Sequence, residues 1–167
     1  MKFLAPLLGV VIYLALQAAV AGRIAIGPIA PDFVVVCVVL FGLQRGSIQG
    51  SLFGFFVGFL VDLSNPGYLG LNALTKSLLG FAAGGLGAAA SPGVLVLAIV
   101  FFVGALAHDF VYLLIYMWPG VGGALLTVVT RALPSALYTA VAGIAVERIL
   151  ALLGAKVVTS FGKERQY

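Results

Sequence analysis

The sequence predicts an all-α, polytopic membrane protein with six transmembrane helices. Of the 167 residues, 63% are hydrophobic and only 8% are charged, and the mean hydropathy is +1.23. In soluble domains about a quarter of the residues carry charge. Because a spanning helix needs about 20 residues, the chain has room for five or six crossings and little else. We therefore expect residues 1–167 to form a single transmembrane domain.

A glycine ladder inside an apolar run is the second observation behind this prediction. A glycine recurs at every fourth position from Gly42 to Gly58. Lipid provides no hydrophobic force to bring helices together, so small residues that let two backbones approach supply van der Waals packing instead. The pattern therefore predicts close packing, either within the chain or against a partner helix. The candidate residues are Gly46, Gly50, Gly54, Gly58, Gly80, Gly84 and Gly87.

The first two helices are predicted from apolar runs bounded by proline and charge. The first covers about residues 3–21, and its small residues at 19–21 imitate a signal-peptide cleavage site. Since further hydrophobic segments follow at once, we interpret it as an uncleaved span. The second covers about residues 32–43 and begins behind Pro31, because proline is favoured at the first helical position. It would rise only about 18 Å, so it needs shielding by protein.

Two helices are then expected on either side of a turn. The third helix covers about residues 46–61 and carries the glycine ladder. Residues 64–67, with the sequence SNPG, form a turn by composition. The fourth helix covers about residues 72–89, and the SPG sequence at 91–93 ends it.

The last two helices complete the six crossings. The fifth covers about residues 93–118 and ends in Tyr116 and Trp118, side chains that are enriched at membrane interfaces. The sixth covers about residues 132–153. The apolar stretch 121–130 before it is too short to span, so we place it on the outer interface or at a kinked start of the sixth helix.

Basic residues in the short loops predict the orientation, because lysine and arginine are retained on the cytoplasmic side. One face receives Lys2, Arg45, Arg148, Lys156, Lys163 and Arg165, and the other receives only Arg23 and Arg131. Both termini should therefore be cytoplasmic. The basic tail, residues 154–167, is expected to lie along the inner leaflet, where anionic lipid attracts it.

With this orientation, polar and ionisable residues from five segments fall in the outer half of the bilayer. These residues are Asp32, Asp62, Asn72, Lys76, His108, Asp109 and Arg131. A charge at such a depth costs about 2.5–3.5 kcal/mol on insertion scales, so it usually faces the bundle interior or a partner charge. We expect a polar pocket that opens outward, with Lys76 paired to Asp62 or Asp109.

Simpler interpretations exist for three of these residues. Asp32 lies in the first turn of its helix, where a carboxylate favours the helix dipole. Asp62 can merely end its helix at the interface, and Lys76 can extend its amine to the headgroups. The pair His108 and Asp109 is the hardest to explain in this way, because no helix end is near it.

Several function classes are excluded by the sequence. A single histidine cannot build a multi-histidine metal site, and the single cysteine, Cys37, allows neither an intrachain disulfide nor a thiolate cluster. No phosphate-binding loop, nucleophile elbow or paired-acid motif is present. The net charge of +4 comes from residues at helix ends and not from a nucleic-acid-binding patch. We expect no enzymatic activity, no cofactor, no metal and no nucleic-acid partner.

Four motifs in a fixed order carry a resemblance to a known family. They are Pro31-Asp32-Phe33, Gln44-Arg45-Gly46 with the ladder that ends on Asp62, the sequence GYLGLNA at 67–73, and the sequence RALPS at 131–135. Over essentially the whole chain they resemble the bacterial rod shape-determining protein MreD family. Lys76 and the pair His108 and Asp109 are not part of the family pattern. The prediction that they line the pocket therefore rests only on their expected depth in the membrane.

The resemblance implies a subunit of the cell-elongation machinery in the bacterial inner membrane. Its implied partners are MreC, the actin-like MreB, and a RodA-type glycosyltransferase with its penicillin-binding partner. It also implies a fold similar to the S components of energy-coupling-factor transporters. Fold alone does not establish a ligand.

Two functions therefore remain open. In the first, the protein is a non-enzymatic subunit that binds the transmembrane helix of MreC and helps control cell shape and peptidoglycan synthesis. In the alternative, it is a small-molecule or lipid-binding, transporter-like subunit with an outward-facing polar pocket. Loss of ligand binding with intact assembly, after replacement of Asp62 and Asp109, would favour the alternative.

Overall fold

The computed structural model describes residues 22–27, 29–64, 67, 69–89, 93–116 and 126–152. Within these residues there are five long helices and no strand, apart from one isolated bridge between Ile26 and Ile29. The predicted all-α class is confirmed. The predicted first span at 3–21, the tail at 154–167 and the interfacial Trp118 lie outside the described residues.

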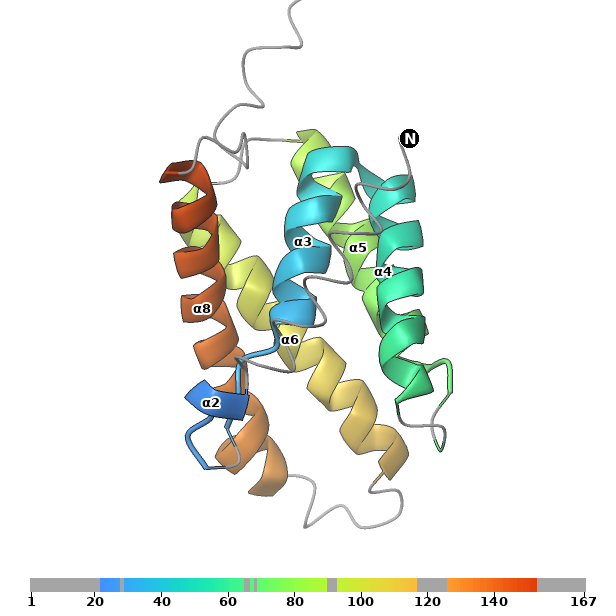
Figure 1. The fold of residues 1–167 in the computed structure, drawn as a ribbon, viewed down its shortest axis with the longest axis vertical. Coiled ribbons are helices and arrows are strands. Elements are labelled where there is room, and N and C mark those ends of the chain that lie inside the picture. The colour runs from blue at the N-terminus through green and yellow to red at the C-terminus, as the bar shows by residue number, and fades with distance from the viewer. Residues whose placement is uncertain are drawn as a thin grey trace, which may run out of the picture.

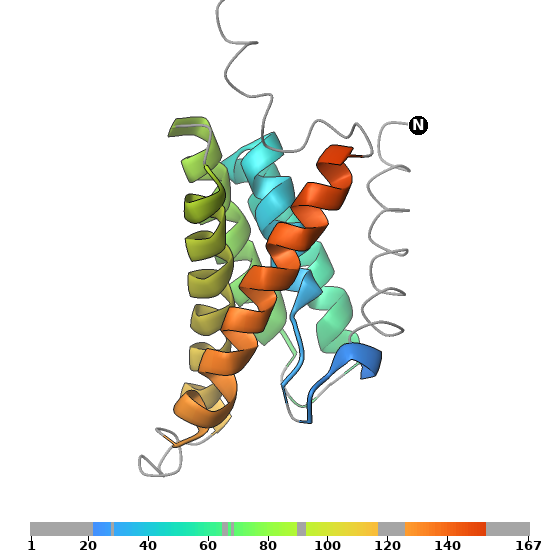
Figure 2. The ribbon, with the colours of Figure 1, turned by 90° about the vertical axis from the view of Figure 1, so that its left-hand side faces the viewer.

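Helix α3 (Phe33–Arg45) is the central helix of the bundle. Helices α4 and α5 lie on one side of it and α8 on the other, and α6 crosses behind it from the α8 side to the α4–α5 side (Figures 1 and 2). Eight of its thirteen residues are buried, and most of these are valines. The helix rises only about 20 Å, which is short for the hydrocarbon core of about 30 Å. Neighbouring helices bury most of it, and a helix too short to span is tolerated at membrane depth where protein covers it.

Helices α4 (Ser47–Leu63) and α5 (Leu71–Ala89) pack backbone against backbone. A Cβ atom on Gly54 would collide with the carbonyl oxygen of Lys76, and one on Gly58 would collide with that of Asn72. The contact is reciprocal, since a Cβ on Gly80 would meet the carbonyl group of Gly50. No residue other than glycine fits at these crossing points without moving one helix away from the other.

The ladder glycines therefore serve contacts inside the chain. Positions 50, 54 and 58 face α5, and positions 80, 84 and 87 of α5 face α4 or the end of α3. A partner helix cannot reach the same backbone, so a partner interface through these glycines is not available. Gly46 differs, because it ends α3 with φ of 91° and a Cβ there would touch nothing within 4 Å. Its role is to allow a left-handed backbone between two helices.

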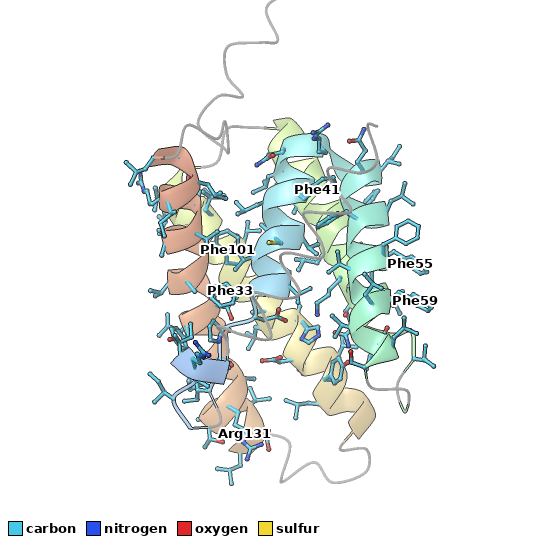
Figure 3. All side chains as sticks on the ribbon, in the orientation of Figure 1. Phe33, Phe41, Phe55, Phe59, Phe101 and Arg131 are labelled. Carbon is cyan, nitrogen blue, oxygen red and sulfur yellow. The ribbon has the colours of Figure 1, made fainter. Side chains whose placement is uncertain are left out.

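Helices α6 (Val94–Tyr116) and α8 (Leu133–Leu152) pack against each other and against α3. Phe101 of α6 is fully buried, and its ring covers Gly143 of α8, where a Cβ would lie 2.7 Å from a ring carbon. Figure 3 shows this ring between α8 and α3. Aromatic and aliphatic side chains thus fill this half of the core, whereas glycine backbone fills the α4–α5 half.

The last helix begins earlier than predicted. A π-helical turn, η3 (Val128–Ala132), precedes α8, and residues 126–127 before it are already helical. The N–H of Leu133 donates to the carbonyl oxygen of Val128, and Pro134 has no N–H with which to continue a regular pattern. The second of the two expected placements for residues 121–130, a kinked start, therefore holds for residues 126–130; residues 121–125 are not described.

Two of the described helices are long and apolar enough to cross a membrane. These are Val94–Leu113 within α6 and Val128–Leu152, which joins η3 and α8. Helices α3 and α4 are apolar but shorter. Large apolar side chains such as Phe55 and Phe59 of α4 project outward from the bundle (Figure 3).

The neighbouring glycines Gly84 and Gly85 give a matched test of the backbone packing. A Cβ on Gly84 would overlap the backbone of Gly46 and Ser47, whereas one on Gly85 would meet only Ser47 Oγ at 3.5 Å. Overpacking costs about 1–3 kcal/mol, and each kcal/mol lowers Tm by about 2–4 °C at this chain length.

We expect Gly84→Ala to lower the thermal midpoint in detergent by several degrees. Gly85→Ala should leave it unchanged or raise it slightly, because alanine is the better helix former. Equal behaviour of the two variants would contradict the described α4–α5 contact.

Candidate functional site

Polar side chains gather at the end of the bundle where α3 and α5 begin and α4 ends, the lower end in Figure 1. Hydrogen bonds and ion pairs join them into one connected set, which we call the polar cluster. Its members are Asp32, Asp62, Asn72, Lys76, His108, Asp109, Tyr112 and Thr139. Five helices contribute, so the cluster fixes their positions relative to one another.

Asp62, near the end of α4, caps the start of α5. Its Oδ2 accepts the backbone N–H groups of Gly70 and Ala73, both at 3.0 Å, and its Oδ1 accepts that of Asn72 at 3.1 Å. These are the N–H groups that a helix start leaves without partners, and Gly70 has no side chain to serve them. A carboxylate at this position also favours the helix dipole. Asp62 is 1% exposed, so it is a buried cap and does not end α4 at the interface.

Asn72 is the centre of the polar cluster. Its amide nitrogen donates to Asp62 Oδ1 at 2.9 Å and to the hydroxyl of Tyr112. Its amide oxygen accepts from Lys76 Nζ at 2.9 Å and lies 3.0 Å from His108 Nε2. All four hydrogen-bonding positions of this buried side chain are therefore occupied.

Lys76 is buried, at 1% exposure, and pairs with Asp32, whose Oδ2 lies 3.6 Å from Nζ. The predicted pairing with Asp62 or Asp109 is wrong. Both oxygens of Asp62 are taken by the N–H groups of α5, and Asp109 contacts His108 instead. The lysine amine thus stays inside the protein and does not reach the headgroups.

Asp32 has three roles at the start of α3. Its Oδ1 accepts the N–H of Val35 at 3.0 Å, which makes it the N-cap of α3. Its backbone N–H donates to Thr139 Oγ1 at 2.9 Å, and the hydroxyl of Ser135 donates to the carbonyl oxygen of Ala30 at 2.7 Å. These two bonds tie the segment before α3 to α8. The interpretation of Asp32 as a helix-start residue agrees with this geometry, and its ion pair with Lys76 is additional.

His108 and Asp109 contribute from α6. His108 Nδ1 lies 3.3 Å from Asp109 Oδ1, and the imidazole centroid lies 4.9 Å from that of Tyr112. The side chain of Asp109 is 34% exposed and that of His108 is 15% exposed. Asp109 is therefore the most accessible charged group of the polar cluster.

Arg131 is not brought into the polar cluster. It is exposed, on the π-helical turn η3, and Figure 3 shows it at the same end of the bundle. Among the described residues, no ion pair or side-chain hydrogen bond involves it. The expectation that it completes the pocket is therefore not met.

Three functional or structural residues were not among the sequence candidates. Tyr112 and Thr139 bind Asn72 and Asp32, but a hydroxyl in an apolar helix gives no distinctive signal. Glu147 is buried at 3% exposure, with Oε2 3.8 Å from Nε of the exposed Arg148. It is the only carboxylate within the predicted span 132–153, and the depth argument applied to Asp109 could have identified it.

The buried polar groups of the polar cluster satisfy one another. Within the described residues, every fully buried side-chain nitrogen and oxygen has a hydrogen-bond partner. No three histidine, cysteine or acidic side chains lie close enough there to hold a metal ion. The arrangement can hold helices together, and the side chains of Asp109 and Asp32, at 34% and 26% exposure, are its partly exposed acidic groups.

An apolar groove lies beside the polar cluster, between α5 and α6, with a volume of about 450 Å³. Leucine, isoleucine and valine side chains form most of its walls, and Ala82, Ala83, Gly104 and Ala107 are its small residues. At the end nearest the polar cluster it reaches Thr75 and His108. Two other grooves among the described residues are smaller, at about 350 and 300 Å³.

One comparison with known proteins gives a match. The family model described as rod shape-determining protein MreD matches residues 1–157 of this chain. No curated protein and no solved structure matches.

The ion pair of Lys76 and Asp32 is suited to a double-mutant test. Removing one member of a buried pair costs about 3–5 kcal/mol because the other charge is left uncompensated, whereas replacing both is often neutral. Asparagine at position 32 keeps the helix cap. Because the side chain of Asp32 is 26% exposed, we expect Lys76→Met to cost an amount near the lower end of that range.

The double variant Lys76→Met with Asp32→Asn should recover most of that loss. Chemical unfolding in detergent micelles measures both values. If the two substitutions together cost the sum of their separate losses, the pair contributes no coupling and the assignment of Asp32 as the partner of Lys76 is wrong.

Proposed function

Because this chain belongs to the MreD family of rod shape-determining proteins, we propose that it is a non-enzymatic inner-membrane subunit of the bacterial cell-elongation complex. Family membership makes it a rod shape-determining membrane protein. The finer proposal is that it binds MreC and so helps control cell shape and peptidoglycan synthesis. MreB and the RodA-type glycosyltransferase with its penicillin-binding partner are the further proposed members of the assembly.

We propose six crossings with both termini in the cytoplasm and a fold like that of energy-coupling-factor S components. The distribution of charge supports the orientation. Arg45 and Arg148 lie near the ends of α3 and α8, at the end of the bundle opposite to the polar cluster. Basic residues mark the cytoplasmic side, so the polar cluster would face the periplasmic half of the membrane.

The groove between α5 and α6 is the proposed docking site for the transmembrane helix of MreC. Small residues in a membrane helix let a second backbone approach closely, and Ala82 and Ala107 are both exposed in this groove. The ladder glycines have no such exposed backbone, because α5 already covers them. The exposed small residues of the groove are the single observation that carries this assignment.

The alternative function, a small-molecule or lipid-binding subunit, has one observation in its favour. The groove volume of about 450 Å³ falls within the range of about 300–1,000 Å³ that is usual for ligand pockets. The polar cluster itself does not favour a ligand, because its buried members satisfy one another. Any ligand would therefore occupy the groove, with its polar end near His108.

Filling the groove tests the proposal. We expect Ala107→Phe or Ala82→Phe to reduce co-purification with MreC several-fold at unchanged expression, because each ring would occupy the space of the partner helix. Ala145→Phe on α8 is the matched control, since Ala145 is also exposed but does not line the groove. It should leave the complex intact.

The same variants separate the two functions. Normal complex yield for both groove variants would contradict MreC docking in the groove. If, in addition, a lipid or small molecule that co-purifies with the wild-type protein were lost from them, as measured by native mass spectrometry, the ligand-binding function would replace it.

A further inference from the structure

A second apolar groove lies between α6 and the π-helical turn η3, with a volume of about 350 Å³. We call it the α6–η3 groove. It shares two wall residues of α6 with the α5–α6 groove, but its opposite wall belongs to η3. None of its lining residues is polar. They are Val103, Leu106, Ala107 and Phe110 of α6 with Val128 and Ala132 of η3.

The walls of the α6–η3 groove favour a lipid acyl chain over a partner helix. Close helix contact needs small residues at which two backbones approach, and only Ala107 and Ala132 are small here. Ala132 is 4% exposed, while Val103 and Phe110 are more than half exposed and project from the wall. A helix is about 10–12 Å wide with its side chains. A single acyl chain is much narrower, so it can lie between these side chains.

Arg131 lies at the edge of this groove. It belongs to the same π-helical turn as the lining residues Val128 and Ala132, and it is exposed. Val128 also begins the candidate span Val128–Leu152, so Arg131 lies in the first turn of that span, at the lower end of the bundle in Figure 3. A long side chain at such a position extends its charged end to the headgroups. The groove and the guanidinium group therefore lie at the depths of a lipid chain and its phosphate.

The chain offers Arg131 no carboxylate partner. It contains five acidic residues. Four of them are described, and none forms an ion pair with Arg131; these are Asp32, Asp62, Asp109 and Glu147. The fifth, Glu164, lies in the tail that is predicted to be cytoplasmic, and residues 117–125 before η3 include no acidic residue. Because a guanidinium group is always charged, Arg131 is available to an anion from outside the chain.

We propose that Arg131 and the α6–η3 groove bind one anionic phospholipid, with its phosphate on the guanidinium group and one acyl chain along the groove. A guanidinium group can donate two parallel hydrogen bonds to a phosphate. The phosphate of phosphatidylglycerol has no cation in its own headgroup, whereas that of phosphatidylcholine does. The site therefore prefers phosphatidylglycerol. Neither Arg131 nor Val128 lines the α5–α6 groove, so this inference does not depend on whether MreC docks there.

Native mass spectrometry of the full chain, mixed with equal amounts of phosphatidylglycerol and phosphatidylcholine of the same acyl chains, tests the site. We expect the wild-type protein to retain phosphatidylglycerol several-fold more than phosphatidylcholine, and Arg131→Gln to lose this preference. Val128→Trp should reduce the binding of both lipids, because its ring fills the groove while the charge is unchanged. Full phosphatidylglycerol binding by Arg131→Gln would overturn the proposal.

Arg23→Gln is the matched control. Arg23 lies in α2 (Gly22–Ile24), which Figure 1 shows beside the lower part of α8, where the hydroxyl of Tyr138 donates to the carbonyl oxygen of Ile24. Like Arg131 it is exposed and forms no ion pair among the described residues, but it adjoins no lining residue of the groove. Its replacement should leave the lipid preference unchanged. An equal loss in Arg23→Gln would show a general attraction to positive charge and would overturn the site.

Competition by a headgroup without chains tests the role of the groove. Glycerol 3-phosphate presents the same kind of phosphate to Arg131 but has no acyl chain to place between α6 and η3. We expect a large molar excess of it to leave the bound phosphatidylglycerol nearly unchanged. If it reduced the bound lipid to the level of Arg131→Gln, the phosphate contact alone would account for binding, and the proposed lipid site would be wrong.

Discussion

The direct backbone contact between α4 and α5 is the constraint on which the rest of the structure depends. Glycines on both helices remove the side chains that would hold them apart, and this closeness places Asp62 of α4 over the first N–H groups of α5. The same bonds orient Asn72, which then accepts from Lys76 and His108. The polar cluster is thus a consequence of the packing and cannot form if the two helices separate.

Charges inside a membrane protein are tolerated here because each one has a defined partner. Asp62 binds backbone donors, Lys76 binds Asp32 and Asn72, and His108 binds Asp109. A cluster of this kind positions helices relative to one another. The accessible feature of this end of the protein is instead the apolar groove between α5 and α6, and His108 connects the two. Family membership and geometry therefore both favour a protein that binds partners within the membrane.

The sequence predicted the gathering of polar residues but not their pairing. Helix order and the distribution of basic residues suffice to bring Asp32, Asn72 and Lys76 to one end of the bundle. They do not reveal that Asp62 binds backbone N–H groups at the start of α5 and not Lys76. Nearly every residue has a backbone N–H, so this donor leaves no signal in the sequence. The glycine spacing predicted close packing, yet only coordinates show whether α5 or a partner covers it. The early start of the last helix depends on a π-helical turn before Pro134, for which no simple pattern exists.

Cysteine cross-linking in native membranes tests the α4–α5 contact most directly. The hydroxyl oxygens of Ser51 and Ser77 lie 2.9 Å apart, which is compatible with the short Cβ–Cβ separation that a disulfide requires. In a Cys37→Ala background, Ser51→Cys with Ser77→Cys should cross-link rapidly under mild oxidation, whereas Ser51→Cys with Ser135→Cys should not, because α3 separates α4 from α8 (Figure 1). Absence of the first cross-link in protein that is present at normal levels would contradict the packing and, with it, the origin of the polar cluster.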